Sequence, residues 1–143
     1  MSNLDTAVQI ASRAHAGQFD KAGQPYILHP LRVMLCFESE NEMIVSVLHD
    51  VIEDSQVTIN DLLHEGFSEA IIDAISCLTK KADEDYFDFI ARVSKNKLAK
   101  SVKIEDLKDN LKLSRLREVT DGDLWRIAKY HKALKFLLSS REN

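Results

Sequence analysis

The sequence predicts an all-α protein, folded as a compact bundle of about eight helices. Apolar residues recur at helical spacing along nearly the whole chain, and no stretch shows the strict alternation of a half-buried strand. Only four glycines and two prolines interrupt 143 residues, of which 45% are hydrophobic. A chain of this length buries roughly two thirds of the surface of its unfolded form, so it can form a core without disulfides or a structural metal.

Residues typical of helix ends divide the chain into these elements. Asn3 as an N-cap and Gly17 just past the end bound the first helix, at about residues 4–16. A loop holding both prolines follows, and Pro30 suits the first turn of the second helix because a missing N–H costs nothing there. A short helix after Thr58 is expected to stop near Gly66. The other five are expected at about 41–54, 68–78, 85–94, 98–116 and 121–140. No repeat or linker separates them, so residues 1–143 are expected to form a single domain.

Composition excludes several classes of protein. Cys36 and Cys77 lie in apolar stretches without metal-ligand spacing, which predicts reduced core thiols and no disulfide. Asp5 and polar residues stand where a signal peptide needs an apolar core, and no window approaches the roughly 18 apolar residues of a membrane span. We therefore expect a soluble cytoplasmic protein without a membrane partner. The net charge of −4 also argues against a broad nucleic-acid surface.

The charges are unevenly distributed along the chain. Residues 33–79 contain ten acidic residues and no Lys or Arg, which is a formal charge of −10, while the remainder carries +6. A segment that attracts cations is thus joined to segments that attract phosphate. The alternative is that these acidic residues only form solvated helix faces.

Within the acidic segment, the predicted helix at 41–54 carries an unusual polar face. A helical wheel places His49, Asp50, Glu53 and Asp54 opposite a wide apolar arc. Asp50 stands three and four residues before Glu53 and Asp54, the spacing that brings side chains together. Three carboxylates this close repel one another unless a cation lies among them.

A second polar pair lies on the predicted helix at 98–116. Asp106 and Asn110 point inward from an apolar flank, opposite a stripe that is expected to face water and consists of Glu105, Lys108, Lys112 and Arg115. A buried carboxylate must be protonated, paired with a cation or bound to a metal. A salt bridge with Lys103 is the structural alternative.

His29, at the start of the second predicted helix, completes a candidate ligand set with His49, Asp50 and Asp106. Two imidazole nitrogens and two carboxylates suit Mn, Fe, Co or Zn better than calcium. Each residue also has a structural interpretation, with His29 as a helix cap and His49 as a hydrogen-bonded edge residue. The other histidines stand apart from acidic clusters and receive no role; they are His15, His64 and His131.

Three stretches, AHAGQFDKAGQPYILHPLRV, VLHDVIEDS and VKIEDLKDNLKL, resemble the HD-domain phosphohydrolases. Over residues 7–116 they are similar to the hydrolase domain of the bifunctional (p)ppGpp synthetase/hydrolases and to small stand-alone alarmone hydrolases. The resemblance implies an HD-domain fold in which His29, His49, Asp50 and Asp106 bind one manganese ion. It also implies that Glu53 and Asp54 position and activate the attacking water, and that Lys21 and Asn110 lie near the nucleotide.

The implied reaction of this stringent-response family is the removal of pyrophosphate from the 3′ position of (p)ppGpp, which leaves GDP or GTP. The expected partner is a small nucleotide, and no nucleic-acid partner is expected.

Two positions depart from the family. Asp20 precedes Lys21 where a basic pair is usual, and Asp109 replaces a histidine or tyrosine, so two negative charges are expected near a tetra-anionic substrate. The alternatives are the same chemistry on another nucleotide or phosphorylated metabolite, and a helical binding module without activity.

Overall fold

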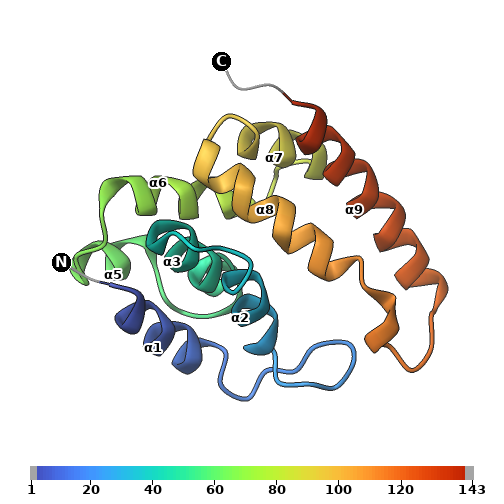
Figure 1. Ribbon diagram of the computed structural model, residues 1–143, viewed down its shortest axis with the longest axis horizontal. Helices are drawn as coiled ribbons and strands as arrows, with labels where there is room; N and C mark the ends of the chain where they lie inside the picture. Colours follow the sequence, from blue (N-terminus) through green and yellow to red (C-terminus); the bar gives the residue numbers. More distant parts are fainter. Residues whose placement is uncertain (1–2, 141–143) are drawn as a thin grey trace.

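The structure, a computed structural model, describes residues 3–140 and confirms the all-α class (Figure 1). No strand is present in this part of the chain, only an isolated bridge between Phe19 and Pro25. The elements in order are α1 (Leu4–Ala14), α2 (Leu28–Met34), α3 (Glu40–Leu48), α4 (Val51–Asp54), α5 (Ile59–His64), α6 (Glu69–Leu78), α7 (Tyr86–Val93), α8 (Lys97–Asn110), the 3-10 turn η1 (Leu113–Arg115) and α9 (Asp121–Ser139).

Helix α3 is the centre of the bundle. It packs against α1 and α2 on one side and against α6 and α8 on the other, while α9 runs along α8 (Figure 1). The run from Ile44 to Leu48 is buried throughout, as expected of a helix surrounded by others. Leu48 of α3, Ile75 of α6 and Leu107 of α8 are fully buried in the shared core. This packing brings α2, the end of α3 and the middle of α8 together.

The helix ends agree with their sequence signals. The Asn3 side chain accepts the backbone N–H of Thr6, and Gly17 has a φ of 80° just after α1. Thr58 starts α5 with a capping box. Side-chain acceptors therefore satisfy N–H groups that a helix start leaves without partners.

The predicted helix at 41–54 is wrong as a single element, because a turn at His49 and Asp50 separates α3 from α4. In an unbroken helix, consecutive side chains point about 100° apart. Here the break brings the His49 Nε2 and Asp50 Oδ2 atoms to 3.1 Å from each other. The interruption thus allows two neighbouring residues to face the same cluster.

The predicted helix at 98–116 is also too long, since α8 ends at Asn110 and the turn η1 follows. The reason lies in the last turn, where the Arg115 guanidinium folds back and donates to the carbonyl oxygen of Asp109 at 2.7 Å. Arg115 therefore does not belong to a water-facing stripe with Glu105 and Lys108. It contacts the C-terminal end of α8 instead.

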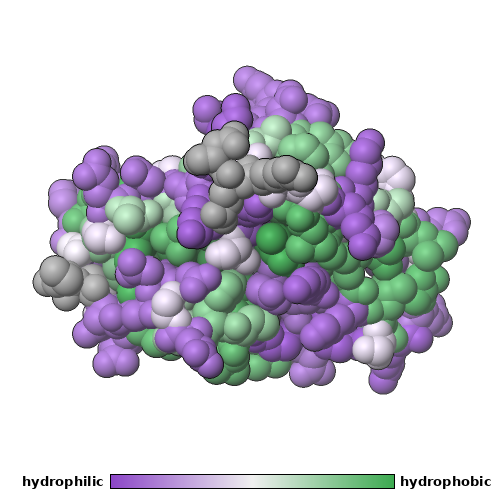
Figure 2. All heavy atoms as spheres, turned by 45° about the horizontal axis from the view of Figure 1, so that its top comes forward, coloured by the Kyte–Doolittle hydropathy of each residue, from purple (hydrophilic) through white to green (hydrophobic). Residues whose placement is uncertain are grey.

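The structure also bears on what the sequence predicted for the two cysteines and for a membrane span. Both cysteines are free, but only Cys77 is partly buried; Cys36 is exposed because α2 ends before it. On the face shown in Figure 2, hydrophilic side chains surround separate hydrophobic patches. Among the described residues, none of the helices combines the length and apolar character needed to cross a bilayer.

Candidate metal centre

The four predicted ligands converge in the interior, although three separate parts of the chain supply them. His29 comes from α2, His49 and Asp50 from the turn between α3 and α4, and Asp106 from α8. Each offers one nitrogen or oxygen atom, and these atoms all lie within 4.8 Å of one another. His29, His49 and Asp106 are only 4%, 2% and 3% exposed. Such a group of three buried donors and the partly buried Asp50 has the composition of a divalent metal site.

Hydrogen bonds orient both imidazole rings. The Nδ1 atom of His49 lies 2.5 Å from the carbonyl oxygen of Ser46, and because a carbonyl only accepts, this nitrogen carries the proton. His29 Nδ1 likewise donates to Asp109 Oδ2 at 2.7 Å. In the neutral rings both Nε2 atoms are then free of protons and face the cluster. Metal-binding histidines are held in this manner.

The two oxygens of Asp106 have different partners. Its Oδ2 atom accepts from Lys103 Nζ at 2.7 Å, so the salt bridge considered as an alternative is present. Its Oδ1 atom faces His29 Nε2 at 2.7 Å and His49 Nε2 at 3.1 Å. Burial acts to lower the pKa of Lys103, but the charge of Asp106 raises it, so the lysine stays charged. Asn110 Nδ2 also donates to Oδ1 at 3.3 Å, and Oδ1 is the oxygen that faces the cluster.

Tyr26 is a residue of this site that the sequence analysis missed. Its hydroxyl donates to Asp50 Oδ2 at 2.5 Å, and both burial and the charge of Asp50 raise the pKa of Tyr26. The buried His15, to which no role was given, packs its ring 4.9 Å from the Tyr26 ring. Tyr26 lies in an irregular loop, where helical periodicity cannot show which side chains point inward. The only feature that links it to the site in the sequence is its position three residues before His29.

The structure corrects the expectation for Asp109. This residue is 6% exposed, receives the His29 Nδ1–H, and pairs with the Arg32 Nε and Nη2 atoms at 3.0 and 3.1 Å. Burial acts to raise the pKa of Asp109, but the hydrogen bonds from His29 and Arg32 hold it well below its usual range. Its negative charge is thus compensated, and it orients a predicted metal ligand. His29 and Arg32 stand about 80 residues earlier, beyond the reach of local patterns.

The predicted catalytic pair lies at the surface beside the cluster. Glu53 and Asp54 occupy α4, directly after the turn that carries His49 and Asp50. Glu53 Oε1 accepts the backbone N–H of Lys80 at 2.6 Å. Partial burial and the charge of Asp50 raise the pKa of Asp54. The same two causes raise the pKa of Glu53, although the hydrogen bond from the Lys80 N–H acts to lower it. A carboxylate with a raised pKa is a stronger base than an ordinary one.

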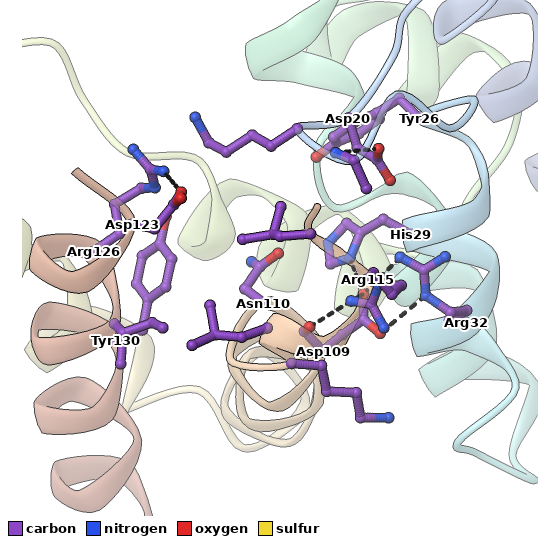
Figure 3. A pocket seen from close by; sticks show the side chains of 16 residues that line it. Asp20, Tyr26, His29, Arg32, Asp109, Asn110, Arg115, Asp123, Arg126 and Tyr130 are labelled. Carbon is purple, nitrogen blue, oxygen red and sulfur yellow. Dashed lines mark hydrogen bonds and ion pairs between the residues drawn. The ribbon is translucent and has the colours of Figure 1, made fainter. Parts of the chain in front are cut away.

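A pocket of about 300 Å³ opens beside His29, between α2 and its preceding loop on one side and α9 on the other (Figure 3). Both predicted substrate residues, Lys21 and Asn110, line it, and Asn110 stands between the two walls. Asp20 also lines it, with its Oδ1 atom accepting the backbone N–H groups of Ala22 and Gln24 at 2.9 Å. The cationic lining residues are Lys21, Arg32, Lys112, Arg115 and Arg126.

The metal-free protein is expected to lose stability as pH rises from about 6.5 to 9. Burial acts to lower the pKa of His29, but hydrogen bonds to Asp106 and Asp109 raise it to about 9. A group whose pKa is raised by folding stabilises the protein fully below its unfolded pKa and loses that effect through its folded pKa. The loss should be about 3 kcal/mol in the free energy of unfolding. Urea unfolding in EDTA across this range measures it, and a flat or rising profile would contradict it.

No family model matches the chain. Curated relatives named guanosine-3′,5′-bis(diphosphate) 3′-pyrophosphohydrolase do match it. The Borreliella burgdorferi protein is 38% identical over 82 residues, which is 54% of this chain and 12% of that protein. The Haemophilus influenzae protein is 45% identical over 78 residues, 50% of this chain and 11% of that one. These relatives confirm the resemblance predicted from the motifs, although the chain spans only about an eighth of their length.

A solved structure confirms the fold. It is described as a metazoan ortholog of SpoT that hydrolyzes ppGpp and plays a role in starvation responses. It matches with a TM-score of 0.79 at 21% identity and covers 97% of this chain and 86% of its own. The helical arrangement that positions the four converging residues therefore occurs in a second protein.

Proposed function

We propose that this chain is a metal-dependent pyrophosphohydrolase that removes pyrophosphate from the 3′ position of (p)ppGpp. The observation that carries the proposal is the convergence of His29, His49, Asp50 and Asp106 in a chain similar to proteins named for this reaction. Residues 1–143 would act as one domain of the HD type, on a small nucleotide in the cytoplasm.

We propose Mn²⁺ as the metal, with His29, His49, Asp50 and Asp106 as its ligands. The donor set fits, because two imidazole nitrogens and two carboxylates suit a borderline divalent ion, and both rings already present Nε2 to the cluster. A bound divalent ion lowers the pKa of water and polarises a phosphoryl oxygen.

The chain's own residues supply the remaining chemistry. Glu53 accepts a proton from the attacking water, and Asp54 holds that water in position. The water oxygen then bonds to phosphorus, the bond from phosphorus to the 3′ oxygen breaks, and the 3′ oxygen takes up a proton. In the pocket, Lys21 neutralises phosphate charge and the Asn110 amide binds the nucleotide.

A second candidate is the same chemistry on another nucleotide or phosphorylated metabolite. Asp20 favours it, because this carboxylate lines the pocket where the family usually has a basic residue.

A substrate panel separates the two candidates. EDTA-treated protein reloaded with Mn²⁺ should convert ppGpp to GDP and pyrophosphate, measured by ion-exchange chromatography. Cleavage of another nucleotide without ppGpp turnover would support the second candidate, and a metal-loaded protein that cleaves nothing would support the binding module.

Replacing Lys21 with alanine is expected to raise KM by about three- to tenfold and to change kcat less, because an exposed loop lysine contributes to binding more than to the chemical step. Steady-state kinetics with ppGpp measure both constants. Lys95→Ala, which removes the same charge at an exposed position outside the pocket, is the matched control. An unchanged KM would show that the loop does not contact substrate.

A further inference from the structure

We propose that Asp109 is a positioning residue that holds Arg32 and Arg115 as a subsite for a nucleotide phosphate group other than the one attacked. The inference rests on the proposed function, which it deepens by assigning a binding role to the residues behind His29. Asp109 is one of the two positions at which the sequence departs from the family, and the three residues come from α2, α8 and η1.

The subsite and the metal cluster lie on different sides of one imidazole ring. His29 directs Nε2 to Asp106 at 2.7 Å and Nδ1 to Asp109 at 2.7 Å. A phosphate bound at the arginines is therefore separated from the metal ligands by the ring of His29. This placement suits the uncleaved phosphate end of a nucleotide.

The two guanidinium groups are fixed but not saturated. Arg32 uses Nε and Nη2 to bind both oxygens of Asp109, and Arg115 uses Nη2 to bind its backbone carbonyl. Within residues 3–140, the Nη1 atom of neither arginine makes a hydrogen bond to these groups or to any other. Arg115 Nη2 also lies 3.4 Å from Asp109 Oδ2, so two positive charges face one carboxylate and the cluster keeps an excess positive charge. Guanidinium groups with free N–H donors are well suited to phosphate.

The rest of the pocket fits a nucleotide carrying such a phosphate. Lys21 and Lys112 add positive charge to the lining and Asp20 adds one negative charge, while Arg126 is paired with Asp123. Leu113 and Ile127 provide apolar walls for a nucleoside. Tyr130, on the α9 side of the pocket, provides another (Figure 3). The ligand class that follows is a nucleoside diphosphate, such as the GDP left by the proposed reaction.

Isothermal titration of EDTA-treated protein with GDP, GMP and guanosine tests the subsite without the metal taking up phosphate. Wild-type protein should bind GDP more tightly than guanosine. Arg115→Ala should weaken GDP binding about tenfold, the effect of losing a hydrogen bond to a charged group, and leave guanosine binding unchanged. Arg117→Ala, an exposed arginine outside the pocket, is the matched control and should change neither. Equal weakening of GDP and guanosine by Arg115→Ala would overturn the subsite.

Asp109→Asn tests the positioning role, because the amide keeps the shape but has one acceptor for both His29 and Arg32. It should weaken GDP binding and also lower the affinity for Mn²⁺ by about 10- to 100-fold, whereas Arg115→Ala should leave Mn²⁺ affinity unchanged. Retention of both affinities in Asp109→Asn would overturn the proposal.

Wild-type protein that fails to cleave ppGpp would refute the proposed function and leave these binding results intact. Normal turnover with unaltered GDP binding in Arg115→Ala would refute the subsite alone.

Discussion

Asp106→Asn is expected to lower Mn²⁺ affinity by more than about 100-fold and to reduce ppGpp hydrolysis to background. The substitution removes an anionic donor that faces both imidazole rings. Loss of a residue that merely orients a ligand already costs about 10- to 100-fold, so loss of a ligand should cost more. Asparagine is preferred to alanine because its amide oxygen can still accept from Lys103. Alanine would leave that partly buried cation unpaired, which would itself destabilise the fold.

Metal content after dialysis and calorimetric titration with Mn²⁺ measure this loss. Circular dichroism shows whether the variant has folded. Asp73→Asn, which removes an exposed carboxylate on α6, should retain metal and activity. An Asp106→Asn protein that binds one Mn²⁺ per chain with wild-type affinity would show that Asp106 is only a partner of Lys103.

Glu53→Gln is expected to keep the metal and to slow the chemical step by about 10²- to 10⁴-fold, the usual contribution of a general base. Glutamine keeps an oxygen that can accept the Lys80 N–H, so the contact between α4 and the segment after α6 is retained. It loses only the ability to take a proton. This variant therefore separates chemistry from metal binding.

Single-turnover kinetics at saturating ppGpp measure the step, and Mn²⁺ titration checks that the centre is still loaded. Glu118→Gln, at an exposed position after η1, is the control and should behave as wild type. If Glu53→Gln loses metal as completely as Asp106→Asn, then Glu53 is a ligand and the division of roles proposed above is wrong.

Local signals predicted most of the fold. Caps such as Asn3 and Thr58 act within three residues, and the structure has both in the expected positions. The break between α3 and α4 was not predictable in this way, since the residues 41–54 satisfy helical periodicity throughout. The early end of α8 was missed for a related reason, because Leu113 continues the apolar pattern while Arg115 folds back on Asp109.

Some residues of the candidate site were recognisable from the sequence and others were not. His29, His49, Asp50 and Asp106 were recognisable as polar residues in places that packing does not explain, and their motifs pointed to one family. Tyr26 and Asp109 were not recognisable, because what matters about them is the atom each one contacts. Tyr26 donates to a residue 24 positions later, and Asp109 receives from one 80 positions earlier.

The sequence by itself determined the helical class, most helix boundaries and the identity of the four converging residues, because these depend on local propensity, periodicity and residue chemistry. Only the tertiary structure decided which nitrogen of each histidine faces the cluster, and that Asp109 is compensated by His29 and Arg32. The physical reason is that side-chain direction and charge compensation arise where α2 packs against α8. The sequence of either helix taken alone does not reveal the contact between α2 and α8.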